Sequence, residues 1–246
     1  MNKVLNRFIN RFPLLLLAAL LALQIYAPSV APAENFADLR DQMVRYQLKG
    51  RDISDARVLK AMSVVPRHRF VPERLQTMAY QDTPLPIGHG QTISQPYIVA
   101  LMSQLLAVEP GQRILEIGTG SGYQAAVLAE MGASVYSIEI VPELGRQARK
   151  ALDPLGYKTV HLKIGDGYQG WPNHAPFDGI IVTCAPTRIP EPLKSQLAEG
   201  GHMVIPVGSR NHQQLVLLTK KHGEIRREKV VDVRFVPMVD VSGKTY

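Results

Sequence analysis

Cysteine is nearly absent from this chain of 246 residues, which contains a single one, Cys184. A lone cysteine excludes an internal disulfide and any metal site built from several thiolates. The seven histidines do not compensate, because no two of them form an H-x-H or H-x-x-x-H pair. The sequence therefore predicts no metal site. With 46% hydrophobic and 20% charged residues, the composition instead fits one ordinary globular domain with small additions.

An excess of either charge is also missing from most of the chain. The formal net charge is +7, but Lys3, Arg7 and Arg11 belong to an N-terminal segment without acidic residues. Setting these three aside from the 28 basic residues leaves 25 against 21 acidic ones, scattered rather than clustered. Because a nucleic-acid surface needs a basic patch or stripe, we expect no nucleic acid among the partners.

Long hydrophobic runs are missing except near the N-terminus. Residues 12–33 carry no charge, and residues 14–23 are all leucine or alanine. Basic residues precede this run, and Ala31-Pro32-Ala33 follows it with the small residues that a signal peptidase reads. The densest apolar part has about 10 to 14 residues, whereas a spanning helix needs roughly 20. Residues 1–33 are therefore interpreted as a signal peptide, in preference to a membrane anchor or a buried helix.

Export follows from this interpretation. Under the positive-inside rule the basic residues stay in the cytosol, and the chain after the apolar run crosses the membrane, whether or not the run is cleaved. We therefore expect a periplasmic protein that contacts the membrane only through its N-terminal segment. A cytoplasmic location is the alternative.

Two regions follow the leader. Residues 34–109 are expected to be mainly helical. Within them, residues 38–75 have helical periodicity with Leu39, Met43 and Tyr46 on one face. A further helix begins at Pro96, a proline position typical of a first helical turn, with Ser94 or Gln95 as its cap.

Residues 110–246 alternate short apolar strands with helices. Strands are expected at 113–117, 134–140, 159–164, 177–182 and 202–207, and helices at 123–131, 142–155 and 191–197. Such alternation predicts a parallel sheet with helices on both faces. Residues 214–219 and 228–236 are strand-like on either side of a turn at His222-Gly223, so an antiparallel hairpin closes the sheet. The predicted fold is α/β: a doubly wound, mostly parallel sheet with an N-terminal helical addition and a C-terminal antiparallel hairpin.

A glycine-rich loop, residues 118–122, connects the first strand of this sheet to its helix. Glycine lets the backbone approach a ligand closely, and the start of the helix offers free N–H groups. Glu139 lies twenty-one residues after the first glycine, at the end of the second strand, where a carboxylate can accept both hydroxyls of a ribose. Loop and acid together predict a nucleotide-type ligand. The loop residues expected to contact it are Gly118, Thr119, Gly120 and Gly122.

The spacing of the glycines excludes a dinucleotide. The fingerprint G-x-G-x-x-G needs a third glycine at position 123, where this chain has Tyr123. Glu116, two residues before the first glycine, would repel a phosphate and attract an ammonium group. A nucleoside with an amino-acid tail, S-adenosylmethionine, suits both Glu116 and Glu139.

Asp166 and Gly167 follow the third strand, where an aspartate can reach the N6 amino group of adenine. A non-catalytic binding module is disfavoured, because it would have no reason to keep carboxylates around the ligand.

The motif typical of enzymes that methylate base amines is absent. The strand at 177–182 runs into Thr183-Cys184-Ala185-Pro186, at the edge of the sheet where acceptors bind. Base-amine methyltransferases have an Asn or Asp there, followed by Pro-Pro and an aromatic residue. Its absence argues against a base as acceptor. Cys184 has no positioned base beside it in the sequence and is interpreted as a packing residue.

Three segments carry a resemblance to a known family. They are Gly90-Gln91-Thr92-Ile93-Ser94-Gln95-Pro96, the run from Leu115 through the glycine loop to Ala126, and Val182-Thr183-Cys184-Ala185-Pro186. Over residues 39–238 the chain resembles the protein-L-isoaspartate O-methyltransferases. The Gly-Gln-Thr-Ile-Ser run is much more specific than the glycine loop. The chain departs from the family in having a leader, and in Cys184, where a second alanine is common.

The resemblance implies a Rossmann-like, class I methyltransferase fold with its last strands exchanged in order. It also implies S-adenosylmethionine as methyl donor, and isoaspartyl-containing peptides and proteins as partners, methylated at the free carboxyl to begin their repair. By position it makes Ser94 the active-site serine in a substrate loop with Thr92 and Ile93, Glu139 the ribose carboxylate, and Asp166-Gly167 the adenine contact.

This chemistry needs no general base. A carboxylate with a pKa near 4 is ionised at neutral pH and can attack the sulfonium methyl directly, so the protein supplies alignment and a dry site. We expect Ser94 to donate a hydrogen bond that orients the substrate carboxylate or its neighbouring amide. A plain helix cap is the alternative role for Ser94. Another acceptor, RNA or a small metabolite, stays open, and we expect a monomer.

Overall fold

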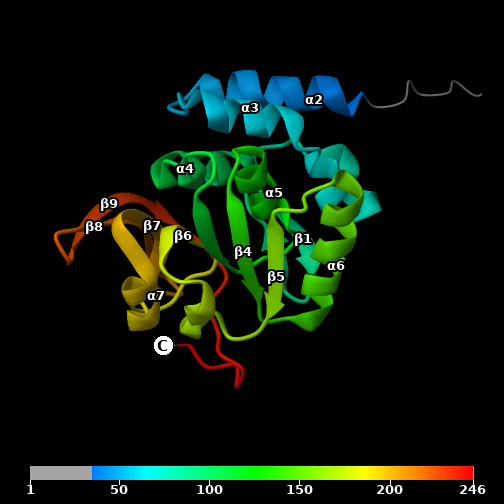
Figure 1. The fold of residues 1–246 in the computed structure, drawn as a ribbon. Helices are drawn as coiled ribbons and strands as arrows, with labels where there is room; N and C mark the ends of the chain where they lie inside the picture. The colour runs from blue at the N-terminus through cyan, green and yellow to red at the C-terminus, as the bar shows by residue number, and fades with distance from the viewer. Residues whose placement is uncertain (1–34, 246) are drawn as a thin grey trace, which may run out of the picture. The chain divides into compact units, whose positions relative to one another are not determined.

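Within residues 35–245, which this computed structural model describes, seven strands form one sheet in the order β5-β4-β3-β6-β7-β8-β9 (Figure 1). The predicted signal peptide, residues 1–33, lies outside the described residues. The strands are β3 (Arg113–Ile117), β4 (Ser134–Glu139), β5 (Val160–Ile164), β6 (Phe177–Val182), β7 (Leu197–Ser209), β8 (His212–Lys221) and β9 (Glu224–Val233). Strands β3 to β7 pair in parallel, and β8 and β9 are antiparallel to their neighbours.

Helices cover both faces of this sheet, which confirms the doubly wound fold. Alternate residues of a strand point to opposite faces, so Ile114 and Leu115 of β3 belong to two different buried clusters. The first cluster packs under α4, α5 and α6, and the second includes Leu193 of α7. The helices are α4 (Pro96–Leu106), α5 (Tyr123–Glu130), α6 (Pro142–Leu152) and α7 (Glu191–Gln196).

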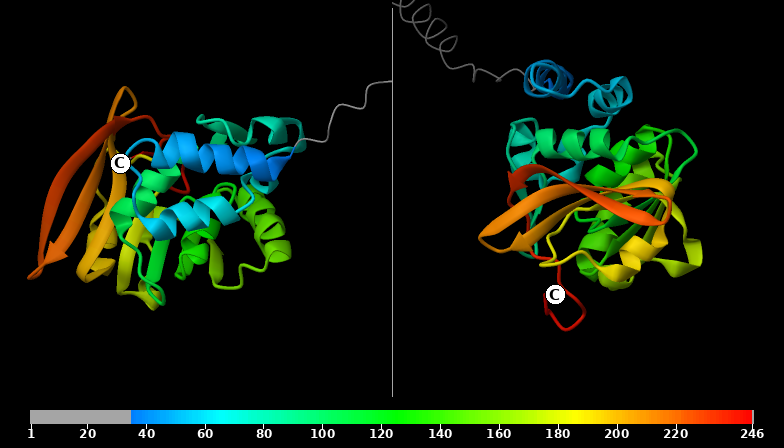
Figure 2. Two further views of the ribbon diagram at one scale, coloured as in Figure 1. Left: turned by 90° about the horizontal axis from the view of Figure 1, so that it is seen from above. Right: turned by 90° about the vertical axis from the view of Figure 1, so that its left-hand side faces the viewer.

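The last three strands, β7, β8 and β9, lie side by side in the order in which they occur in the chain. The predicted antiparallel hairpin is confirmed, and it consists of β8 and β9. Lys221 pairs with Glu224 across a two-residue loop, and both loop residues, His222 (φ 56°) and Gly223 (φ 77°), have the positive φ of a type I′ turn. Strands β8 and β9 form a long twisted ribbon at one end of the sheet (Figure 2). The predicted extension of the second strand to residue 236 is wrong, because β9 ends at Val233 and the chain turns back toward the parallel strands.

The N-terminal region is helical but wound differently from the prediction. It contains α2 (Phe36–Gln42), a π-helix η2 (Met43–Lys49), α3 (Ala56–Val64) and the 3₁₀ turns η3 (Arg67–Phe70) and η4 (Glu73–Met78). The expectation that Tyr46 lies on the buried face is wrong, since Tyr46 is 74% exposed. In a π-helix the backbone hydrogen bonds join residues five positions apart rather than four. Met43 and Leu48, five positions apart, are therefore the buried pair.

From Phe36 onward the chain forms one compact unit. Buried side chains of the N-terminal helices, such as Met43 and Met62, share a cluster with α4 to α6 and with one face of the sheet. The division after residue 109 therefore separates two regions of sequence that pack around a common core. No helix among residues 35–245 combines the length and the hydrophobicity needed to cross a membrane.

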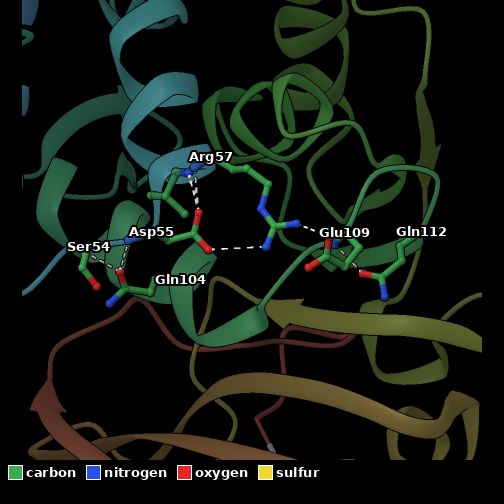
Figure 3. A network of polar contacts seen from close by, with 7 residues as sticks. Ser54, Asp55, Arg57, Gln104, Glu109 and Gln112 are labelled. Atoms are coloured by element: carbon green, nitrogen blue, oxygen red, sulfur yellow. Dashed lines mark hydrogen bonds and ion pairs between the residues drawn. The ribbon is translucent and has the colours of Figure 1, made fainter.

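A polar network joins α3 to α4 and to the turn before β3 (Figure 3). The Asp55 carboxylate caps α3, accepting from the backbone N–H groups of Arg57 at 2.8 Å and Val58 at 3.2 Å. The Gln104 side-chain oxygen accepts from the backbone N–H of Asp55 at 2.9 Å, and Arg57 pairs with Glu109. Because Gln104 belongs to α4, the network fixes the helix that begins directly after the Gly-Gln-Thr-Ile-Ser run.

Candidate active site

A cavity opens at the carboxyl ends of β3, β4 and β6, which we call the edge cavity. This is the edge at which open parallel sheets bind ligands. Its wall comes from five segments: residues 117–121 after β3, residues 138–141 after β4, Thr183 and Cys184 after β6, residues 91–94, and residues 236–239, with Val99, Tyr123, Gln124 and Gly167 filling between them. Residues 91–93 form β2 (Gln91–Ile93), which pairs with β1 (Leu85–Gly88) in a separate small sheet.

Gly118 and Gly120, two of the residues expected to contact a ligand, line the edge cavity. Gly118 has φ of +96°, and a Cβ at this position would lie 2.5 Å from Thr183 Oγ1. The same Thr183 hydroxyl donates to the Gly118 carbonyl at 2.6 Å. Glycine is thus required for the loop to pass the end of β6 and expose its backbone to the cavity.

Glu139 lies in the wall of the edge cavity at the end of β4 and is 5% exposed. Its two oxygens accept from the backbone N–H of Gly120 at 2.7 Å and of Val141 at 2.9 Å. A carboxylate oxygen has two lone pairs, so each oxygen keeps one for a ligand hydroxyl. The geometry fits a ribose whose two hydroxyls donate to this carboxylate.

Two further residues of the glycine loop, Thr119 and Gly122, differ in their position relative to the edge cavity. Thr119 lies in the wall, with its hydroxyl 2.6 Å from that of Ser137. Gly122 is absent from the wall, and its expected ligand contact stays a prediction. It begins α5 at φ of +88°, and a Cβ there would lie 3.1 Å from Leu152 Cδ1 and 3.3 Å from Ala148 Cβ. Gly122 therefore permits the close packing of α5 against α6.

Glu116 does not reach the edge cavity, contrary to the expectation that its carboxylate would face the ligand. It is fully buried on the α5 face of β3, where Ser137 Oγ donates to its Oε2. Burial raises the pKa of Glu116 to about 8, with a smaller contribution from the charge of Glu139 and an opposing one from the Ser137 hydrogen bond. Its carboxyl group is therefore mainly protonated at neutral pH and connects to the wall through the hydroxyls of Ser137 and Thr119.

This burial predicts a pH-dependent stability. In the unfolded chain Glu116 loses its proton above its ordinary pKa of 4.5, whereas the folded protein keeps the proton up to about pH 8. Glu116 therefore lowers the free energy of unfolding as pH rises between these values, by at most about 1.4 kcal/mol per pH unit. Urea unfolding of Glu116→Gln without donor should lack this decline. Parallel pH curves for the variant and wild type would contradict the prediction.

Asp166 and Gly167 are separated by the local backbone. Gly167 lines the edge cavity, and a Cβ there would lie 2.4 Å from Ile117 Cγ2. Asp166 is not part of its wall: its Oδ1 accepts from the backbone N–H of Tyr168 at 2.8 Å and caps the 3₁₀ turn η6 (Gly167–Gln169), and its expected adenine contact stays a prediction. The aspartate side chain faces a neighbouring hollow that Arg188 also lines.

Thr92, Ile93 and Ser94 all lie in the wall. They are distant from the glycine loop in sequence but line the same cavity. The alternative role of Ser94 as the helix cap is wrong, because the residue at the cap position of α4 is Gln95 and no side chain of the cap bonds to the helix. Asp82 takes over this role: its Oδ1 accepts from the backbone N–H of Tyr97 at 3.1 Å. The Ser94 hydroxyl is therefore not committed to α4.

Residues 236–239 in the wall were not foreseen from the sequence. The backbone N–H of Ala185 donates to the Val236 carbonyl at 2.8 Å, and that of Met238 donates to the Ala185 carbonyl at 2.9 Å. The Tyr168 hydroxyl also donates to the Met238 carbonyl at 3.0 Å. Pro237, which interrupts the strand-like pattern, was the local signal that the strand ends here.

The wall holds few titratable groups. Besides Glu139 they are Tyr123 and Cys184, and burial raises the pKa of both. Cys184 thus stays a thiol, which suits a packing residue better than a nucleophile. Among residues 35–245 no group of three or more His, Cys, Asp or Glu side chains could hold a metal ion.

A glycine loop after β3 and an acid at the end of β4, at the edge of a doubly wound sheet, are consistent with the fold of the class I methyltransferases. The sequence model of one family, protein-L-isoaspartate(D-aspartate) O-methyltransferase, matches residues 38–243, and the chain belongs to that family.

Proteins of this family are similar to the chain over most of its length. The protein-L-isoaspartate O-methyltransferase of Gloeobacter violaceus is 57% identical over 197 residues, which cover 80% of this chain and 96% of that protein. Protein-L-isoaspartate O-methyltransferase 2 of Marinobacter nauticus is 53% identical over 212 residues, or 85% of this chain and 97% of that protein.

Solved structures of such enzymes have a similar fold. One protein-L-isoaspartate O-methyltransferase has a TM-score of 0.75 at 30% identity and covers 83% of this chain and 67% of its own. A putative protein-L-isoaspartate O-methyltransferase from Plasmodium falciparum, solved with S-adenosyl-L-homocysteine, has a TM-score of 0.71 at 30% identity and covers 83% of this chain and 98% of its own.

Proposed function

We propose that this chain transfers the methyl group of S-adenosylmethionine to the free carboxyl of L-isoaspartyl residues in damaged proteins, within the edge cavity. The observation that carries the assignment of the site is the composition of the wall. It combines Glu139 and the loop of Gly118 and Gly120 with the specific segment Thr92, Ile93 and Ser94.

In this proposal the donor lies along the ends of β3 and β4. Glu139 accepts from the ribose hydroxyls, and the backbone of Gly118 and Gly120 faces the amino-acid tail. Gly167 faces the adenine, and its lack of a side chain lets it pack directly against Ile117. The acceptor enters between residues 92–94 and the tail residues 236–239, with the Ser94 hydroxyl donating to its carboxylate or to the neighbouring amide.

The methyl transfer proceeds without a base from the wall. The ionised carboxylate attacks the methyl carbon, its C–O bond forms as the C–S bond breaks, and the sulfonium leaves as a neutral thioether. The described titratable groups of the wall fit this reaction, since Tyr123 and Cys184 have raised pKa values and keep their protons at neutral pH. Mutual approach of opposite charges is favoured in a site from which water is excluded.

The test compares acceptors with a methyl-labelled donor. An isoaspartyl peptide should accept label, and its normal aspartyl counterpart of the same sequence should not. RNA and small metabolites serve as the competing acceptors. Label that enters RNA or a metabolite, with none in the isoaspartyl peptide, would overturn the proposed acceptor while leaving the donor site intact.

A second proposal concerns location: the N-terminal segment exports the enzyme as a monomer that meets the membrane only through that segment. Support comes from Lys3, Arg7 and Arg11 ahead of an uncharged run over residues 12–33.

We predict that fractionation of the native host finds the protein in the periplasm with a mature N-terminus near Glu34. A variant without residues 2–33 is the matched control and should stay in the cytosol with the same specific activity. Full-length protein that begins at Met1 and is found in the soluble cytosol would contradict export. Sedimentation of the purified protein tests whether it is a monomer.

A further inference from the structure

Arg67 is a fully buried cation that contacts the active-site segment from behind. It lies in η3, and its side chain is inaccessible to solvent. Its Nε donates to the Ala79 carbonyl at 2.7 Å, and its Nη2 donates to the Ser94 carbonyl at 2.7 Å. One guanidinium therefore ties the end of η4 to a residue in the wall of the edge cavity.

A second residue of the wall also contacts this guanidinium. Its central carbon lies 4.8 Å from the centre of the Tyr123 ring, within the range of a cation–π interaction. Tyr123 lines the edge cavity from the start of α5. Arg67 thus supports two neighbouring parts of the wall, and it does so without lining the cavity itself.

The charge of Arg67 is poorly compensated by the protein. Burial lowers its pKa to about 10, so the guanidinium stays protonated at neutral pH. Asp82 attracts it from a distance, but that carboxylate pairs with Arg51 at 3.1 Å and caps α4. Within the described residues, Arg67 Nη1 has no hydrogen-bond acceptor.

We propose that Arg67 is a positioning residue that makes the acceptor site selective for a carboxylate. It holds the backbone of Ser94 in place and supplies a buried positive charge behind that residue. A buried charge without a counter-ion is unfavourable, and a negative group that enters a water-excluding site nearby relieves this cost. The inference rests on the proposed function, because it assumes that the acceptor carries an ionised carboxyl group.

The experiment measures the discrimination between charged and neutral acceptors. An isoaspartyl peptide is compared with its isoasparaginyl analogue, which has a neutral amide and is assayed as a competitive inhibitor. Wild type should bind the charged peptide at least tenfold more tightly than the neutral one. Arg67→Met should reduce this ratio to near one. Arg67→Lys, which keeps the charge, should retain most of the ratio while the acceptor KM rises.

Two controls separate positioning from stability. Affinity for S-adenosylmethionine should change less than threefold in both variants, since the hydrogen bonds and the cation–π contact of Arg67 involve Ala79, Ser94 and Tyr123 rather than the loop 118–120. Arg40→Met is the matched arginine variant: Arg40 Nε also donates to a backbone carbonyl, that of Ser63 at 2.6 Å, but neither residue lines the edge cavity. It should keep the wild-type ratio.

An unchanged ratio in Arg67→Met would overturn the proposal, as would an equal loss of both peptides together with the donor. If Arg67→Met does not fold, the lysine variant decides, because loss of its charge discrimination would then contradict the electrostatic role. Failure of the proposed function is a separate outcome, visible as wild type that does not methylate the isoaspartyl peptide at all.

Discussion

Glu139→Ala is expected to weaken the binding of S-adenosylmethionine by about 1.5–3 kcal/mol, the usual contribution of hydrogen bonds to a charged group, or roughly ten- to more than a hundredfold in Kd. The substitution removes the proposed acceptor of the ribose hydroxyls. It also removes the acceptor of the Gly120 and Val141 amides, so that the loop loses part of its support.

Calorimetry with the purified protein measures this loss. Glu143→Ala is the control, because Glu143 is an exposed acid in the next helix, α6, and pairs with Arg146 in an i,i+3 ion pair. Its donor affinity should equal that of wild type. Unchanged affinity in Glu139→Ala would remove the donor-site assignment.

Ser94→Ala is expected to lower turnover of an isoaspartyl peptide by about ten- to a hundredfold at saturating donor, the effect of losing one hydrogen bond to a charged group. Donor affinity should stay the same, because Ser94 belongs to the acceptor side of the wall. A bond made mainly in the reacting complex lowers the rate more than it weakens binding.

Thermal unfolding distinguishes this effect from damage to α4. Asp82, not Ser94, caps this helix, so Ser94→Ala should melt with wild type and Asp82→Ala should melt earlier. Ser195→Ala is the matched serine control, since its hydroxyl donates to the Pro192 carbonyl within α7, away from the edge cavity. Equal turnover in Ser94→Ala and wild type would leave the serine without a role in the reaction.

Much of the wall formed by the glycine loop and Glu139 could be predicted from sequence because its parts follow one another along the chain. A strand, a glycine loop, a helix and a second strand place Gly118 and Glu139 at the same edge, whatever the rest of the protein does. The predicted strand at 113–117 coincides with β3, and the one at 177–182 with β6. These strands could be predicted because each is marked by an alternating or continuous apolar run, which is a local feature of the sequence.

The direction of a side chain was less predictable than its place near the end of a strand. Strand pleating turns Glu116 away from the edge cavity, and an Asx-type cap turns Asp166 toward the backbone of Tyr168. A sequence pattern predicts that an acidic residue lies near the end of a strand. Whether its carboxylate lines the cavity depends on the direction in which the side chain points, which reverses from one strand residue to the next. The π-helical winding that exposes Tyr46 is the same kind of effect.

The sequence by itself determined the doubly wound sheet, the glycine loop with Glu139 and the specific segment from Gly90 to Ser94, because each depends on residues close together in the chain. Only the tertiary structure brought residues 236–239 to Ala185 and Arg67 to the carbonyl of Ser94. These contacts join segments 27 or more positions apart. They depend on how strands, turns and helices pack, and local preferences do not record which distant backbone groups that packing will bring together.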